Sequence, residues 1–233
     1  MNSIREIKKE LLKHKNPRKA EELARFFKTK RGEYGYGDKF LGIVVPIQRK
    51  IAKKYPDLML DELQELILSK YHEFRLTALL VLINKYNKAT IFNKRLAVEF
   101  YLGNTRFINN WDLVDLSASQ ILGDFLLDMK RDVLYELIKS KSLWDRRIAI
   151  IATFAFIRNN QFEDTLRLAE ISLHDTHDLM HKAVGWMLRE VGKRDMAAEE
   201  AFLMKNCKKM PRTMLRYAIE KFPEDKREFY LNQ

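Results

Sequence analysis

The chain has 233 residues, of which 46% are hydrophobic and 32% are charged, and its formal net charge is +11. This composition is typical of a folded globular protein and excludes a disordered or collagen-like chain. With only 8 Gly and 5 Pro, the chain has too few turn residues for a β-sandwich or barrel, so the composition favours an all-helical fold.

The sequence also indicates where the protein works. Its single cysteine, Cys207, excludes an internal disulfide, and its start lacks the basic, apolar and small-residue order of a signal peptide. The longest apolar segment, residues 148–157, is shorter than the roughly 18 residues that a membrane span needs. We therefore expect a cytoplasmic protein without a membrane partner. No heptad pattern or exposed apolar stripe calls for a partner chain, so a monomer is expected.

Apolar residues recur at helical spacing along nearly the whole chain. Ile4, Ile7 and Leu11 mark a first helix, and Pro17 is suited to the first position of a second one. Residues 29–42 hold four of the eight glycines and are expected to form a loop. No strand-like alternation competes over a comparable length. Further helices are predicted at 46–55, 60–68, 73–86, 91–102, 111–125, 132–139, 143–158, 162–173, 177–191, 197–206, 212–221 and 225–231.

These helices recur in pairs about every 35 residues, the period of two-helix solenoid repeats. The sequence therefore predicts an all-α, superhelical solenoid of antiparallel helix pairs, HEAT-like or ARM-type, that forms a single domain over residues 1–233. The concave face of such a solenoid is compatible with a nucleic-acid duplex and with a partner protein, so the architecture leaves the function open.

Positive charge is concentrated in two stretches. Residues 1–56 hold 16 Lys and Arg against 6 Asp and Glu, a net charge of +10, so the rest of the chain contributes only +1. A second, acid-free stretch over residues 204–216 holds five further basic residues. Basic surfaces attract polyanions because neutralised phosphates release their counterions, so nucleic acid is the leading partner. The alternative is a solvated basic face without a ligand.

The segment Asn109-Asn110-Trp111-Asp112-Leu113-Val114-Asp115 is the most specific local feature. Trp111 and Asp115 are four residues apart at the start of a predicted helix, so they share one face. Asp112 lies in the first turn, where the helix dipole favours a carboxylate. An aromatic plane beside a carboxylate suggests a site, whereas the structural alternative makes Trp111 a core anchor and Asp115 a surface acid.

Two further segments stand out, and the first places a tryptophan near a cation on a helix. Trp144 and Arg147 are three residues apart, so they share a face. The third segment runs from His177 to Glu190, and its Gly185 costs a helix about 1 kcal/mol relative to Ala, which indicates close helix packing there.

Most standard sites are absent from the sequence. His177 and His181 have i, i+4 spacing but lack the Glu of H-E-x-x-H, so no metal is expected. The chain has no phosphate-binding loop, dinucleotide fingerprint or nucleophile elbow, and no cofactor is expected. The glycine-rich loop over Tyr34–Phe40 is compatible with DNA contact and with packing over the first repeat, and the packing role is favoured.

Together, Trp111-Asp112-Leu113-Val114-Asp115, Trp144-Asp145-Arg146-Arg147 and the block from Lys182 to Glu190 resemble the AlkD-type DNA alkylation-repair glycosylases, a family built from HEAT-like repeats. The resemblance extends over nearly the whole chain. It implies a monofunctional DNA glycosylase that hydrolyses the N-glycosidic bond of cationic N3- or N7-alkylated purines in double-stranded DNA and leaves an abasic site.

Site residues follow from this resemblance by position. Asp115 resembles the catalytic carboxylate. The implied DNA and lesion contacts are Trp111, Trp186, Arg147, Phe26, Lys182 and Arg189. The chemistry agrees, because a fixed carboxylate stabilises the oxocarbenium charge that develops on the sugar and orients a water.

The chain departs from the family pattern at two positions. Some relatives have a Trp-Trp pair where this chain has Asn110-Trp111, and a Tyr near the position of Phe26. The alternative function is therefore a non-catalytic HEAT-like module that binds DNA structures. A protein-interaction scaffold is a third possibility, and the charge of +10 over residues 1–56 argues against it.

Overall fold

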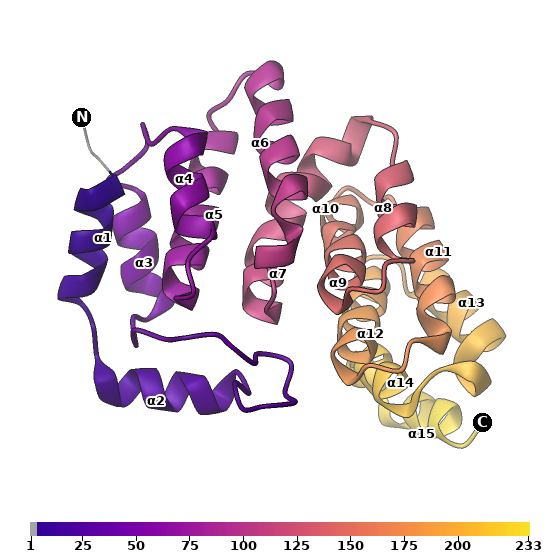
Figure 1. Ribbon diagram of the computed structural model, residues 1–233. Coiled ribbons are helices and arrows are strands. Elements are labelled where there is room, and N and C mark those ends of the chain that lie inside the picture. Colours follow the sequence, from indigo (N-terminus) through magenta and orange to yellow (C-terminus); the bar gives the residue numbers. More distant parts are fainter. Residues whose placement is uncertain (1–3) are drawn as a thin grey trace. The chain divides into compact units, whose positions relative to one another are not determined.

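The structure is a computed structural model that describes residues 4–233, and its regular elements are helices (Figure 1). Over these residues no strand forms, and the only β-bridge is an isolated parallel one between Lys39 and Tyr71. The predicted all-α class is confirmed. None of the helices in this part of the chain is long and apolar enough to cross a membrane.

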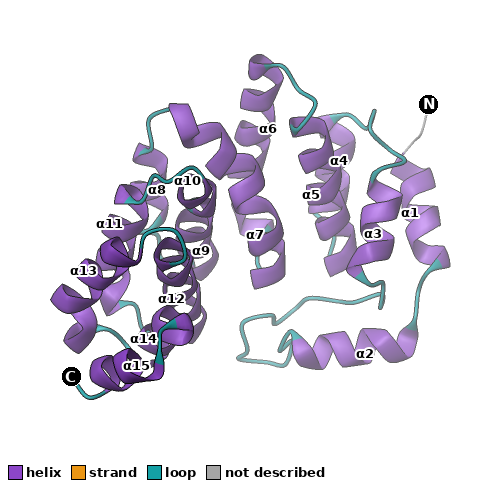
Figure 2. Cartoon of the chain, turned by 180° about the vertical axis from the view of Figure 1, so that it is seen from behind, coloured by secondary structure: helices purple, strands orange, loops and turns teal. Residues whose placement is uncertain are grey.

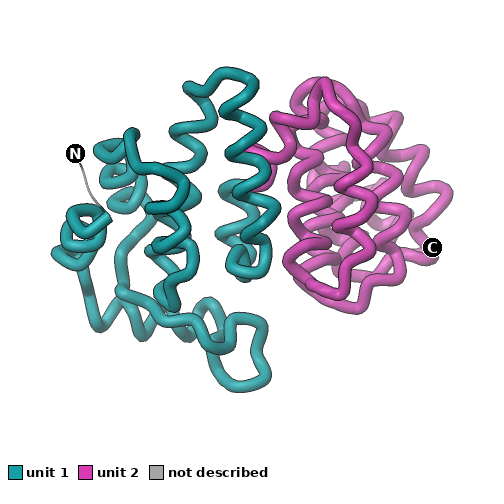
Figure 3. Tube along the Cα trace, turned by 45° about the horizontal axis from the view of Figure 1, so that its top comes forward, with its two compact units in different colours: residues 1–117 teal, residues 118–233 magenta. Residues whose placement is uncertain are grey.

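The chain divides into two compact units, residues 1–117 (unit 1) and residues 118–233 (unit 2) (Figure 3). Within each unit many helices pack against a neighbour or a next neighbour in sequence, as expected of helical repeats. The single domain expected over residues 1–233 stays a prediction. The helices of unit 1 are α1 (Ile4–Lys13), α2 (Pro17–Phe26), α3 (Val45–Ala52), α4 (Leu60–Ile67), α5 (His72–Tyr86), α6 (Ile91–Gly103) and α7 (Trp111–Ala118), whose last residue belongs to unit 2. Those of unit 2 are α8 (Asp132–Leu137), α9 (Leu143–Ala152), α10 (Phe154–Arg158), α11 (Glu163–Ile171), α12 (Asp178–Gly192), α13 (Met196–Asn206), α14 (Arg212–Ala218) and α15 (Glu224–Leu231).

Several helices begin at a residue whose side chain caps them. Before α2, Asn16 Oδ1 accepts a hydrogen bond from the backbone N–H of Lys19 at 3.0 Å, and Pro17 occupies the first helical position. Before α13, Asp195 accepts from the N–H of Ala198 at 3.0 Å. Such caps satisfy backbone donors that the first helical turn leaves unpaired. The predicted beginnings of these two helices therefore agree with the structure to within one or two residues.

In unit 1, helix α2 runs across the ends of α3 and α5 (Figures 1 and 2). A long loop follows α2. The loop returns along these ends before α3 begins. Gly42 in this loop has φ +83°, and a Cβ there would lie 2.1 Å from the carbonyl oxygen of Asn16. Only glycine fits both the backbone conformation and the close approach to the start of α2.

Two predicted helices are less regular than their sequence pattern indicates. The helix predicted over 111–125 continues from α7 into a π-helical turn at Ser119–Gly123, where a Cβ on Gly123 would lie 2.1 Å from the carbonyl oxygen of Ala152 in α9. The helix predicted over 143–158 is divided into α9 and α10 at Thr153, whose hydroxyl donates to the carbonyl of Ile150 at 2.7 Å. A threonine hydroxyl that bonds back to the preceding turn disturbs the regular helical ladder.

In unit 2, α12 packs against α9, α13 and α14. Its buried Gly185 allows a close approach of α14, because a Cβ there would lie 2.4 Å from the carbonyl oxygen of Met214 and 2.5 Å from Cβ of Tyr217. The close packing predicted at Gly185 is confirmed.

Gly185→Ala is expected to lower the free energy of unfolding by about 1–3 kcal/mol, because the new methyl group overpacks the contact between α12 and α14. Urea unfolding followed by circular dichroism measures this loss. Gly103→Ala in α6 is the matched control, since a Cβ there meets no atom within 4 Å. That substitution is expected to leave stability unchanged or raise it by up to about 1 kcal/mol. An equal effect of the two substitutions would contradict the packing argument.

A buried carboxyl packs against the C-terminal end of α12. Glu199 of α13 is 1% exposed, and its Oε2 occupies the space that Gly192 leaves, where a Cβ would lie only 1.6 Å away. Within residues 4–233 its Oε1 has no hydrogen-bond partner. Burial raises the pKa of Glu199 from 4.5 to about 8, against the opposing positive charge of Arg189. Glu199 is therefore neutral in the folded protein at pH 7.

Because an unfolded chain ionises this carboxyl near pH 4.5, folding stability is expected to fall as pH rises from about 4.5 to about 8. The loss amounts to a few kcal/mol, on the order of 1.4 kcal/mol for each pKa unit. Glu199→Gln cannot ionise, so the difference in unfolding free energy between pH 5 and pH 8 should shrink by most of this amount. Urea unfolding of both proteins at the two pH values measures it, and identical pH slopes would refute the assignment.

Candidate functional site

Trp111 lies at the start of α7 in a group of aromatic side chains, the aromatic cluster (Phe26, Phe27, Tyr34 and Trp111). Its ring centroid is 5.8 Å from that of Phe26 in an edge-to-face arrangement, and 5.1 Å from that of Phe27. The indole Nε1 donates to the hydroxyl of Tyr34 at 3.3 Å. Phe26 is 62% exposed whereas Phe27 is buried, so the cluster extends from the core of unit 1 to its surface.

Asp115 lies one helical turn after Trp111 and is partly exposed. Its backbone position puts its side chain on the same face of α7 as Trp111. Leu113 and Val114 point into the core and are fully buried, which fixes the rotation of the helix. Unit 1 thus brings together Phe26 and Trp111, and carries Asp115 on the helix that Trp111 begins.

A buried polar network lies behind the aromatic cluster, and sequence reasoning missed it. His72 at the start of α5 contacts two carboxylates, with Nε2 2.9 Å from Oδ2 of Asp112 and Nδ1 3.4 Å from Oδ2 of Asp38. Arg75 donates to the same Asp38 oxygen at 2.7 Å, and Asn109 donates to the other at 3.3 Å. These five residues, the His72 network, connect α5, the loop and the beginning of α7.

The charges of this network stabilise one another. Burial opposes a charge on His72, but the negative charge of Asp112 and hydrogen bonds to Asp112 and Asp38 raise its pKa to about 9. Burial opposes the charge on Asp38 as well, yet the hydrogen bond to His72 and the positive charge of Arg75 lower its pKa. At neutral pH two buried carboxylates therefore face two buried cations.

Glu73, the neighbour of His72, holds the end of the loop. Its buried carboxylate accepts hydrogen bonds from the backbone N–H groups of Leu41, Gly42 and Ile43 at 2.8–3.2 Å. A single carboxylate thus satisfies three buried backbone donors. Tyr34 is bonded to Trp111 and Asp38 lies inside the His72 network, so this loop packs against the beginnings of α5 and α7, and DNA contact stays open.

In unit 2, Trp186 lies on α12 and is partly exposed. Its Nε1 donates to Oε1 of Glu190 at 3.3 Å, and its ring centroid is 5.9 Å from that of Phe154. The guanidinium of Arg158 lies over the Phe154 ring at 4.4 Å, so this surface combines aromatic faces with positive charge.

The three predicted cationic contacts all have partners inside unit 2. Arg147 is only 5% exposed and donates to the carbonyl of Leu179. Lys182 pairs with Asp178 at 2.8 Å, and Arg189 pairs with Glu220. Lys182 and Arg189 are partly exposed and therefore accessible to a ligand, whereas Arg147 supports the backbone at the start of α12.

His177 and His181 take structural positions at the same helix end. His177 Nδ1 accepts from the N–H of Leu179 at 3.2 Å and so caps α12, while His181 Nε2 contacts the carbonyl of Asp175. Among residues 4–233 no group of three or more side chains has the arrangement of a metal site.

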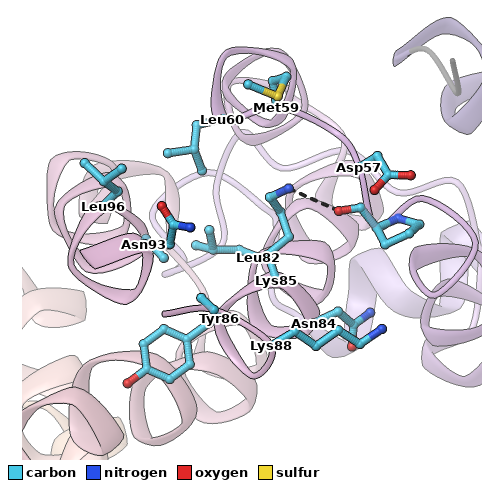
Figure 4. Close-up of a pocket in the computed structure, with 13 residues that line it drawn as sticks. Asp57, Met59, Leu60, Leu82, Asn84, Lys85, Tyr86, Lys88, Asn93 and Leu96 are labelled. Atoms are coloured by element: carbon cyan, nitrogen blue, oxygen red, sulfur yellow. Dashed lines mark hydrogen bonds between the residues drawn. The ribbon is translucent and has the colours of Figure 1, made fainter. Parts of the chain in front are cut away.

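A hollow lies elsewhere in unit 1, between the ends of α4, α5 and α6, with a volume of about 620 Å³ (Figure 4). Its walls are mainly apolar and include Leu60, Leu82 and Leu96, while Lys85 donates to the carbonyl of Pro56 at its edge at 3.1 Å. No predicted site residue lines this hollow. The predicted site residues therefore lie outside this hollow.

The two basic stretches belong to different units. In unit 1 most of the Lys and Arg side chains of residues 5–54 are exposed. In unit 2 the five basic residues of stretch 204–216 are also exposed, and Lys205 pairs with Glu170 at 2.8 Å. Each unit thus presents positive charge to a polyanion.

Comparison with known proteins gives a consistent result. The sequence pattern of a family described as "DNA alkylation repair enzyme" matches residues 7–222. A solved structure described as a predicted DNA alkylation repair enzyme from Enterococcus faecalis is similar with a TM-score of 0.71 and 16% identity, over 91% of this chain and 98% of that one. No curated protein sequence matches the chain significantly. The shared fold confirms the predicted helical-repeat solenoid.

Proposed function

The chain belongs to the family of DNA alkylation repair enzymes, with DNA as its partner, and on this basis we propose that it is a monofunctional DNA N-glycosylase. Its substrate is double-stranded DNA with a cationic N3- or N7-alkylated purine, and its products are the free base and an abasic site. It acts as a cytoplasmic monomer without a cofactor.

The observation that carries this proposal is the position of Asp115, a partly exposed carboxylate one helical turn from Trp111 and its aromatic cluster. When the N-glycosidic bond breaks, both of its electrons go to the base. A cationic base then leaves as a neutral molecule, so no general acid is needed. The sugar becomes an oxocarbenium ion, which the Asp115 carboxylate stabilises while water adds to C1′ and gives its proton to the carboxylate or to solvent.

Aromatic and basic side chains of each unit are proposed to supply binding. Aromatic faces attract positive charge, which suits Trp111 and Phe26 of unit 1, and Trp186 of unit 2, to contacts with DNA around a cationic nucleotide. Lys182 and Arg189 are proposed to leave their ion pairs with Asp178 and Glu220 and to bind phosphate oxygens instead. Arg147 is proposed to support this contact by holding the backbone at the start of α12 through its hydrogen bond to the carbonyl of Leu179.

Base release from a duplex with one N7-methylguanine tests the proposed function. Wild type is expected to release the base and leave an alkali-labile abasic site, and an otherwise identical undamaged duplex is the control. Tight, salt-dependent binding without release from N7- or N3-alkylated duplexes would replace the glycosylase with the non-catalytic DNA-binding module.

A further inference from the structure

His72 connects the two chain segments that carry the aromatic cluster. It lies at the start of α5, with Asp38 of the loop on one side of its ring and Asp112 of α7 on the other. Phe27 and Phe40 stack on the ring, with centroids 5.1 and 4.8 Å away. Phe27 also contacts Trp111, so His72 reaches Trp111 through both Asp112 and Phe27.

The two carboxylates require two donors from one ring. A neutral imidazole has one N–H, so only one of its two contacts with a carboxylate is favourable, and the other brings a lone pair against an anion. The imidazolium donates from both nitrogens. His72 is 2% exposed, so water does not replace a lost bond.

Asp112 depends on His72 more than Asp38 does. Asp38 also accepts from Arg75 and Asn109. Within the described residues 4–233, Asp112 Oδ1 is buried without a hydrogen-bond partner, and its Oδ2 accepts from His72. Loss of the His72 proton therefore affects chiefly the first turn of α7, where Asp112 follows Trp111.

We propose that His72, as a doubly protonated cation, is a positioning residue that fixes the first turn of α7 against the loop and so sets the orientation of Trp111 and Asp115. This role deepens the proposed glycosylase function and rests on it. The charged groups that face the ring are Asp38 from the loop, Asp112 from α7 and Arg75 from its own helix. The high pKa of His72, about 9, agrees with this geometry.

The first test is independent of activity. The imidazole resonances of His72, identified by their loss in His72→Gln, are expected to titrate near pH 9, and the indole N–H resonance of Trp111 should shift with the same midpoint. In Asp112→Asn, the midpoint of both should fall by one pH unit or more. A midpoint of His72 below 7, or a Trp111 resonance that does not follow it, would overturn the proposal even if no base were released.

The second test uses base release. Activity of wild type should fall as pH rises through about 9, and Asp112→Asn should shift this fall to lower pH, which a merely structural loss would not do. Asp145→Asn is the matched control, because Trp144-Asp145 repeats Trp111-Asp112 at the start of α9 while Asp145 accepts from Ser140 instead of a histidine. It should keep the wild-type pH profile. An unshifted profile in Asp112→Asn would contradict the proposed role of His72.

Discussion

Asp115→Asn is expected to reduce the rate of base release about 100- to 1000-fold while the protein still folds and binds DNA. The amide has the same shape as the carboxylate but lacks the negative charge that stabilises the oxocarbenium ion, and removal of one such electrostatic contact typically has this effect. Single-turnover release of N7-methylguanine, scored by alkali cleavage of the abasic site, measures the loss.

Glu99→Gln in α6 provides a control for the change of charge. Glu99 is exposed and only weakly paired with Arg95, at 3.9 Å, so the substitution should leave the rate unchanged. Thermal melting and DNA affinity of both variants should stay close to wild type. Unchanged base release by Asp115→Asn would refute the catalytic assignment.

Glu73→Ala is expected to lower the free energy of unfolding of unit 1 by at least about 3 kcal/mol. The substitution leaves the backbone N–H groups of Leu41, Gly42 and Ile43 without their acceptor, and each buried unsatisfied donor costs about 1–3 kcal/mol. It also leaves a cavity at the start of α5. Urea unfolding measures the loss of stability.

Glu65→Ala in α4 is the control, because Glu65 is exposed and pairs with Lys8 at the surface. Exposed ion pairs contribute about 0–1 kcal/mol, so this variant should stay close to wild type. Because Glu73 anchors the loop that bears Tyr34, Glu73→Ala should also quicken proteolysis within residues 29–42. A loss of stability no larger than that of Glu65→Ala would show that the loop is held by other contacts.

The helices were predictable because their determinants are local. Apolar spacing, Pro17 behind a capping Asn16, and Gly185 within an apolar helix all act within a few residues of the feature they specify. The grouping of Trp111 with Asp115 follows from the same helical geometry. The π-helical turn at Ser119–Gly123 was not predictable, because Gly123 lies against Ala152 of α9 and a glycine in the sequence does not tell which helix it meets. The break at Thr153 was missed because a single threonine in an apolar helical pattern is not a helix-stop signal like glycine or proline.

The His72 network was not predictable for a related reason. His72 and Asp112 are 40 residues apart in sequence, and Tyr34 and Trp111 are 77 apart. No motif spacing relates residues at such separations, and a lone histidine, an arginine and several acids are unremarkable in a charged chain. Only the packing of the loop against the ends of α5 and α7 brings them into contact.

These long separations also set an order of events during folding. Helices α5 and α7 form from local contacts, whereas the bonds from the loop to Glu73, His72 and Trp111 each close a chain segment of 30 residues or more. Closing a segment of that length costs entropy before its contacts form. In refolding experiments the fluorescence of Trp111 should therefore reach its native value after the helical circular dichroism does. The surface proposed to meet damaged DNA is then the last part of unit 1 to take its native structure.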